Sequence, residues 1–117
     1  MDPVAPLPLQ PARLVLSALL AAGAVEALTC AVRFGAGLQG TRDTAFLAPW
    51  TLGLRIHHGY VGALLLAAGF LARLPRRWRR AAFLLGAALL LSDLAHHFLV
   101  LWPLTGSPGL DLAYPGR

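Results

Sequence analysis

Six acidic and histidine side chains of this 117-residue chain lie in or beside its apolar stretches, and their types are those of metal ligands. They are Glu26, His57, His58, Asp93, His96 and His97. The segment Asp93-x-x-His96 places a carboxylate and an imidazole on one helix face, a spacing that metal sites in helical bundles use in the form Glu-x-x-His. Mixed ligation of this kind suits a divalent metal ion: zinc, iron or manganese. The chain has one cysteine, Cys30, which argues against copper(I) and iron–sulfur sites.

Two other hypotheses fit the same residues. One histidine of each doublet would ligate a haem b if the two doublets lie at the same height. Alternatively, the acids and histidines only form hydrogen bonds between helices, with Asp93 accepting from His57 or His58 and Glu26 pairing with Arg33. The chain would then be a non-catalytic accessory or scaffold subunit of a larger membrane complex.

The elements that position these side chains are apolar and long. The composition is 57% hydrophobic and 13% charged, which is unlike a soluble domain of this size. Three apolar runs, at about 13–34, 54–74 and 80–102, each approach the ~20 residues with which a helix crosses a membrane. The sequence therefore predicts an all-α membrane protein with a single domain, 1–117, and three transmembrane helices.

Prolines, glycines and a short connecting segment set the expected boundaries of the helices. The start, from Met1 to Pro11, is a proline-rich lead-in, and the first run is too long for a typical signal peptide that is cleaved. The segment 75–80 is a short loop, so the second and third helices form a tight antiparallel hairpin. Pro103 is expected to end the third helix. The Gly- and Pro-rich tail after it is expected to be solvated, with the alternative that Asp111 folds back over the site.

Arginine placement predicts the orientation. Six arginines fall on one side of the predicted membrane and four on the other. The six are Arg13, Arg73, Arg76, Arg77, Arg79 and Arg80, and the four are Arg33, Arg42, Arg55 and Arg117. The positive-inside rule then places the N-terminus and the 75–80 loop in the cytoplasm, and the C-terminus outside the cytoplasmic (inner) membrane. The formal charge of +5 is explained by topology and interaction with membrane lipid, so no nucleic-acid partner is expected.

Depth and helical phase bring the six side chains together. The two histidine doublets are equidistant from residue 77, at ~29 Å from the hairpin turn and thus near the outer face. Each shares its helix face with small residues, so the polar groups are expected to point into a three-helix interior or an oligomer interface. Because three helices enclose little space, a homo-oligomer or a partner membrane subunit is expected. A catalytic role is left open; a substrate at this depth would be lipid or another amphiphile.

Overall fold

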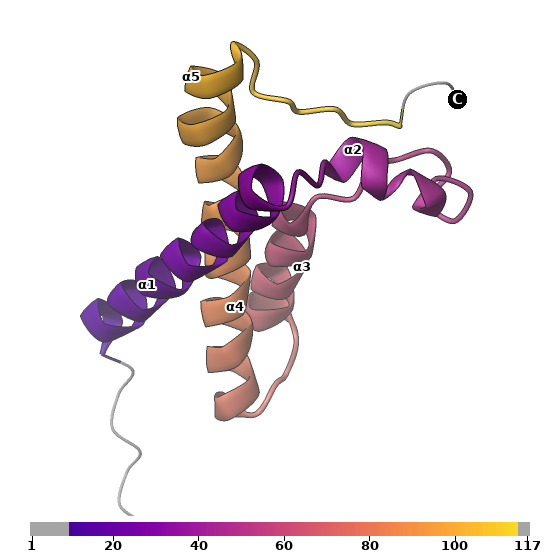
Figure 1. Ribbon diagram of the computed structural model, residues 1–117. Coiled ribbons are helices and arrows are strands. Elements are labelled where there is room, and N and C mark those ends of the chain that lie inside the picture. The colour runs from indigo at the N-terminus through magenta and orange to yellow at the C-terminus, as the bar shows by residue number, and fades with distance from the viewer. Residues whose placement is uncertain (1–9, 115–117) are drawn as a thin grey trace, which may run out of the picture.

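The computed structural model describes residues 10–114, and every regular element within them is helical (Figure 1). This confirms the predicted helical fold class for that range. The elements are α1 (Pro11–Cys30), the π-helical turn η1 (Ala31–Gly35), α2 (Gly40–Asp43), the 3-10 turn η2 (Ala45–Leu47), α3 (His58–Leu71), α4 (Arg76–Ala95), the π-helical segment η3 (His96–Leu101) and α5 (Trp102–Thr105). The lead-in up to residue 9, and Arg117 in the tail, lie outside the described residues.

Two of the three apolar runs form helices that are long and apolar enough to cross a membrane. They are Pro11–Gly35, with 25 residues, and Arg76–Thr105, with 30 residues. The run predicted at 54–74 is helical only from His58 to Leu71, over 14 residues. That corresponds to ~21 Å, which is shorter than a ~30 Å hydrocarbon layer.

The second helix is shorter than predicted at both ends. At its start, Leu54 forms an isolated β-bridge with Ala113, and the Arg55 N–H donates to the Leu112 carbonyl at 3.0 Å. At its end, Ala72 has an extended backbone, three residues before Pro75.

The arginine-rich segment belongs to a helix rather than to a loop. The prediction of a loop at 75–80 was wrong, because α4 begins at Arg76 and the connection from α3 covers only residues 72–75. Pro75 is the N-cap of α4, where its fixed φ and its missing N–H cost the helix nothing. Four of the five clustered arginines therefore lie on the first turns of α4.

Pro103 does not end the last helix, contrary to the sequence prediction. The helix continues to Thr105 and ends at Gly106, whose φ of 77° is a left-handed conformation that favours glycine. The turn before the proline widens, and the Trp102 N–H donates to the His97 carbonyl five residues back. Such π-helical turns accommodate local disruption of the helical ladder, and a proline supplies it by lacking an N–H.

Helix α4 is the central element, and α1 and α3 pack on it separately (Figure 1). Helix α3 runs antiparallel to α4 in close contact: a Cβ added to Gly62 would lie 2.7 Å from the Gly86 carbonyl oxygen. Among the described residues α1 packs against α4 but not against α3. The expected three-helix interior is therefore not formed, and the polar side chains face two different helix pairs.

The C-terminal tail is folded back over the loop that precedes α3, and is not free in solvent as expected. The Tyr114 N–H donates to the Gly53 carbonyl at 2.8 Å, and the Tyr114 hydroxyl lies 2.8 Å from Thr44 Oγ1. Tyr114 is buried. The tail thus forms a cover over the N-terminal end of α3 and the adjacent end of α4 (Figure 1).

Candidate metal centre

The six predicted side chains form two groups, one on each side of α4. His57, Asp93 and His97 make one group, whose ligand atoms lie within 4.8 Å of one another. Glu26 and His96 belong to the other, together with Cys30. The division follows from helical phase, since His96 and His97 are neighbours in sequence and so point about 100° apart around the helix.

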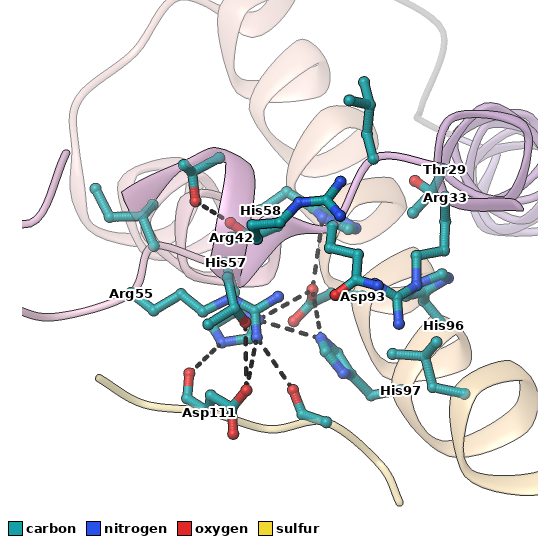
Figure 2. A pocket seen from close by; sticks show the side chains of 18 of the residues that line it. Thr29, Arg33, Arg42, Arg55, His57, His58, Asp93, His96, His97 and Asp111 are labelled. Atoms are coloured by element: carbon teal, nitrogen blue, oxygen red, sulfur yellow. Dashed lines mark hydrogen bonds and ion pairs between the residues drawn. The ribbon is translucent and has the colours of Figure 1, made fainter. Parts of the chain in front are cut away.

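The first group lies where α3 begins and α4 ends. His57 is the N-cap of α3, and Asp93 and His97 are one turn apart on α4 and η3. All three are buried, with exposed fractions of 5%, 8% and 3%. His57 Nδ1 lies 3.1 Å from His97 Nε2, and Asp93 Oδ1 lies 3.8 Å from the former and 3.5 Å from the latter. Figure 2 shows the Asp93 carboxylate between the histidines.

The tail determines which ring nitrogens carry protons in this group. His57 Nε2 lies 3.1 Å from the Asp111 carbonyl oxygen, and His97 Nδ1 lies 2.6 Å from the Pro108 carbonyl oxygen. A carbonyl oxygen only accepts, so both of these nitrogens must donate. The neutral rings then have lone pairs on His57 Nδ1 and His97 Nε2, the two nitrogens that face each other and Asp93.

His58 lies on the edge of this group. Its Nδ1 is 3.5 Å from Asp93 Oδ1, and its Nε2 is buried with no hydrogen-bond partner among residues 10–114. Asp93 in turn packs on the first turn of α3, because a Cβ on Gly59 would lie 2.9 Å from Asp93 Cγ. The partial positive charge of a helix N-terminus favours a carboxylate in this position.

The second group is already satisfied by its own hydrogen bonds. Glu26 Oε1 lies 2.8 Å from His96 Nδ1 and accepts from the Cys30 thiol at 3.1 Å, while Oε2 accepts from the Ser92 hydroxyl at 3.3 Å. These contacts join α1 to α4. The pair between Glu26 and Arg33 that one hypothesis predicted is therefore not formed. The Cys30 thiol donates to the Glu26 carboxylate instead of only filling space between helices.

A cavity of about 770 Å³ adjoins both groups. Its lining includes His57, His58, Asp93, His96 and His97 together with three arginines, Arg33, Arg42 and Arg55. Arg42 forms an ion pair with Asp43 at 2.9 Å. The hydrogen bond from Arg42 to Asp43, together with one from the Gln39 backbone N–H, holds the pKa of Asp43 below its usual range.

Two kinds of site residue were missed or misjudged from the sequence. The carbonyls of Pro108 and Asp111 were not foreseen because backbone groups have no sequence signature, although Gly106 and Gly109 are suited to reversing the chain. Both glycines have positive φ, 77° and 63°. Arginines 33, 42 and 55 were counted for topology alone, and nothing in their spacing indicated that they line one cavity.

The distance between His57 and His97 does not suit a haem held between this pair of rings. Imidazoles on opposite faces of a haem iron have ligand nitrogens about 4 Å apart, with the macrocycle between them. Here the two nitrogens are 3.1 Å apart and the ring centroids 5.0 Å apart, edge to face. The two nitrogens can bind a single ion that lies beside them, but they leave no space for a porphyrin between the two rings.

Comparison with protein-family models, with curated proteins and with solved structures gives no match to this chain. The chemistry of the site must therefore be argued from its residues.

Proposed function

We propose that this chain is a multi-pass membrane protein that holds a divalent metal ion between His57, Asp93 and His97. The observation that carries the proposal is the placement of His57 Nδ1 and His97 Nε2, 3.1 Å apart and beside the Asp93 carboxylate, while the outer nitrogen of each ring faces a tail carbonyl. Three acceptors at this distance repel one another unless a cation lies between them. Either a proton or a metal ion between the three acceptors would remove this repulsion.

Distances favour a metal ion. Two ligands at about 2.0–2.1 Å from a tetrahedral zinc ion lie about 3.3 Å apart. The separations here are 3.1, 3.5 and 3.8 Å. The Pro108 and Asp111 carbonyls accept from the outer N–H groups of His97 and His57. Histidines that bind a metal ion through one ring nitrogen commonly donate the other N–H in this way. Zinc, iron and manganese all suit this donor set.

Membrane insertion is the second part of the proposal, and it rests on exposed apolar surface. Leu20, Leu28, Leu64 and Leu99, on α1, α3 and η3, are 65–74% exposed. Such side chains on helices of this length are solvated by lipid acyl chains at little cost, whereas water disfavours them. The metal group then lies at the end of the hairpin away from the arginines of α4, at the outer face of a cytoplasmic membrane.

Metal content tests the proposal. Protein purified in a nonionic detergent without chelator is expected to contain about one equivalent of zinc, iron or manganese by elemental analysis. His97→Ala and Asp93→Asn are expected to lose it. The matched control is His96→Ala, which changes the adjacent histidine of the satisfied group and is expected to keep the metal.

Two results would contradict the metal site. One is wild-type protein without stoichiometric metal, even after incubation with each of the three ions and dialysis. The other is equal metal content in His97→Ala and His96→Ala. Circular dichroism of each variant shows whether the helices are retained, and Asp93→Asn, which preserves side-chain shape, serves where His97→Ala does not fold.

A second candidate function is that of a subunit in a larger membrane complex, and the loop between α1 and α3 favours it. Phe46, Trp50 and Leu52 are 71%, 84% and 93% exposed there. Large apolar side chains exposed in one loop suit a contact with a partner or with the membrane interface. Co-purification of a fixed partner that is lost in Trp50→Ser, with no metal in either protein, would favour this candidate.

A further inference from the structure

The cavity above the metal group collects arginines from three separate segments. Arg33 comes from η1, Arg42 from α2 and Arg55 from the extended segment before α3. Figure 2 shows these side chains around the histidines and Asp93. The lining also contains two carboxylates, Asp93 and Asp111. Three guanidinium groups thus meet two carboxylates of the lining, and a third carboxylate, that of Asp43, pairs with Arg42.

The three guanidinium groups differ in how far they are neutralised. Arg42 is engaged by both oxygens of Asp43, at 3.1 and 2.9 Å. Arg55 donates to the Gly109 carbonyl at 3.2 Å and lies 3.6 Å from Asp111 Oδ2. Arg33 is partly buried and makes no hydrogen bond or ion pair with any part of the chain that the structure describes.

Arg55 is also fixed in position. Its side chain is only 14% exposed, and a Cβ added to Gly40 would lie 2.8 Å from Arg55 Nη2, so the guanidinium packs directly on the first residue of α2. Because Asp111 is 59% exposed, its contact with Arg55 is open to replacement by another anion. A rigid guanidinium binds an oxyanion with little loss of side-chain entropy.

From this arrangement we propose that the cavity binds a phosphate group, held by Arg33 and Arg55 beside the His57–Asp93–His97 group. Guanidinium forks match the oxygens of phosphate with paired charge-assisted hydrogen bonds. The inference names the ligand class of the proposed metal centre and rests on that proposed function. Two sources share this chemistry: the headgroup of an anionic phospholipid, which reaches the outer end of α3 from the bilayer, and free phosphate.

Calorimetric titration in nonionic detergent tests the proposal and separates the two sources. The probes are inorganic phosphate, dihexanoyl phosphatidic acid and, as the uncharged control, dihexanoylglycerol. Saturable binding of phosphatidic acid but not of dihexanoylglycerol is expected, and both Arg33→Gln and Arg55→Gln are expected to weaken it at least tenfold. Arg73→Gln, in the connection between α3 and α4, is the matched control and is expected to bind like wild type.

The outcomes are distinct. Binding of inorganic phosphate as well, with the same dependence on Arg33, assigns the site to phosphate from either source; binding of phosphatidic acid alone assigns it to the lipid headgroup. No saturable binding of either phosphate probe, or equal binding by Arg33→Gln, Arg55→Gln and Arg73→Gln, overturns the proposal. The metal content of Arg33→Gln is expected to equal that of wild type. This measurement tests the metal centre separately from the phosphate site.

Discussion

Glu26 and Asp93, the two carboxylates that face histidines, differ in how their neighbours satisfy them. Glu26 lies within hydrogen-bond distance of three donors, from Cys30, Ser92 and His96. Asp93 faces three imidazole nitrogens at 3.5–3.8 Å, which is longer than a hydrogen bond of good geometry. The Glu26 group is complete as an interhelical contact, whereas the Asp93 group has room for a cation at its centre.

A glycine fixes the position of Asp93, and this leads to a prediction for one residue. In Gly59→Ala the new methyl group would lie 2.8 Å from Asp93 Cβ and closer still to Oδ2. We expect Asp93 to be displaced, with loss of the bound metal and a decrease of about 1–3 kcal/mol in the free energy of unfolding. Elemental analysis and unfolding in detergent measure the two effects.

Gly23→Ala is the control for this substitution, since a Cβ at Gly23 on α1 would meet no other part of residues 10–114 within 4 Å. It is expected to leave metal content unchanged and to leave stability equal or slightly higher, because alanine favours a helix. Equal metal content in Gly59→Ala and wild type would show that the contact between Asp93 and α3 does not position the carboxylate.

At the scale of elements, close approach of two helices holds the site together. Helices α3 and α4 meet at Gly62 and Gly86, where each glycine lies against the backbone of the other helix. The contact sets the register of the hairpin, and that register places His57, the N-cap of α3, opposite His97 in η3. The widened turn of η3 lies in the same region, from His96 to Leu101. Turns of this kind are frequent at functional sites.

The helix contact predicts the effect of one methyl group. In Gly62→Ala the Cβ would lie 2.6 Å from the Leu90 nitrogen and 2.7 Å from the Gly86 oxygen, so the helices must separate. We expect the free energy of unfolding to fall by about 1–3 kcal/mol, and metal affinity to fall with it. Thermal unfolding in detergent measures the first effect and metal titration the second.

Gly35→Ala serves as its control, because a Cβ at Gly35 would contact no other segment of the described chain within 4 Å. If the two alanine variants unfold alike, the glycine contact does not govern the packing of α3 on α4.

At the scale of the molecule, the clustered arginines of α4 and the His57–Asp93–His97 group lie at opposite ends of the hairpin. The arginines of α4 begin at Arg76, and the histidines lie about 20 residues later, near the other end of the long helix. Helix α1 crosses α4 and reaches the same end through η1, where α2 and the tail also gather (Figure 1). The polar cavity and the basic segment are thus separated by the length of the apolar helices.

This separation predicts labelling from opposite sides of a membrane. In a Cys30→Ser background, Ser107→Cys is expected to react with a membrane-impermeant maleimide in intact cells. Arg79→Cys is expected to react only after permeabilisation. Both positions are exposed, so reactivity depends on the side of the membrane.

The reverse pattern would contradict the proposed orientation. Labelling of both positions in intact cells, or recovery of the protein without detergent, would contradict insertion as a hairpin.

The sequence alone determines that the chain is helical and which residues can do chemistry, because both depend on local features. Each of the three apolar runs contains a helix, although the run at 54–74 is helical over only 14 residues, and six acids and histidines in these runs stand out without any structure. Only the tertiary structure decided that these six divide into two groups, since that depends on how α1 and α3 are placed around α4. It also decided that the tail carbonyls fix the histidine tautomers and that three arginines line one cavity. Backbone groups and distant loop residues have no periodicity in sequence, and only the folded chain brings them together.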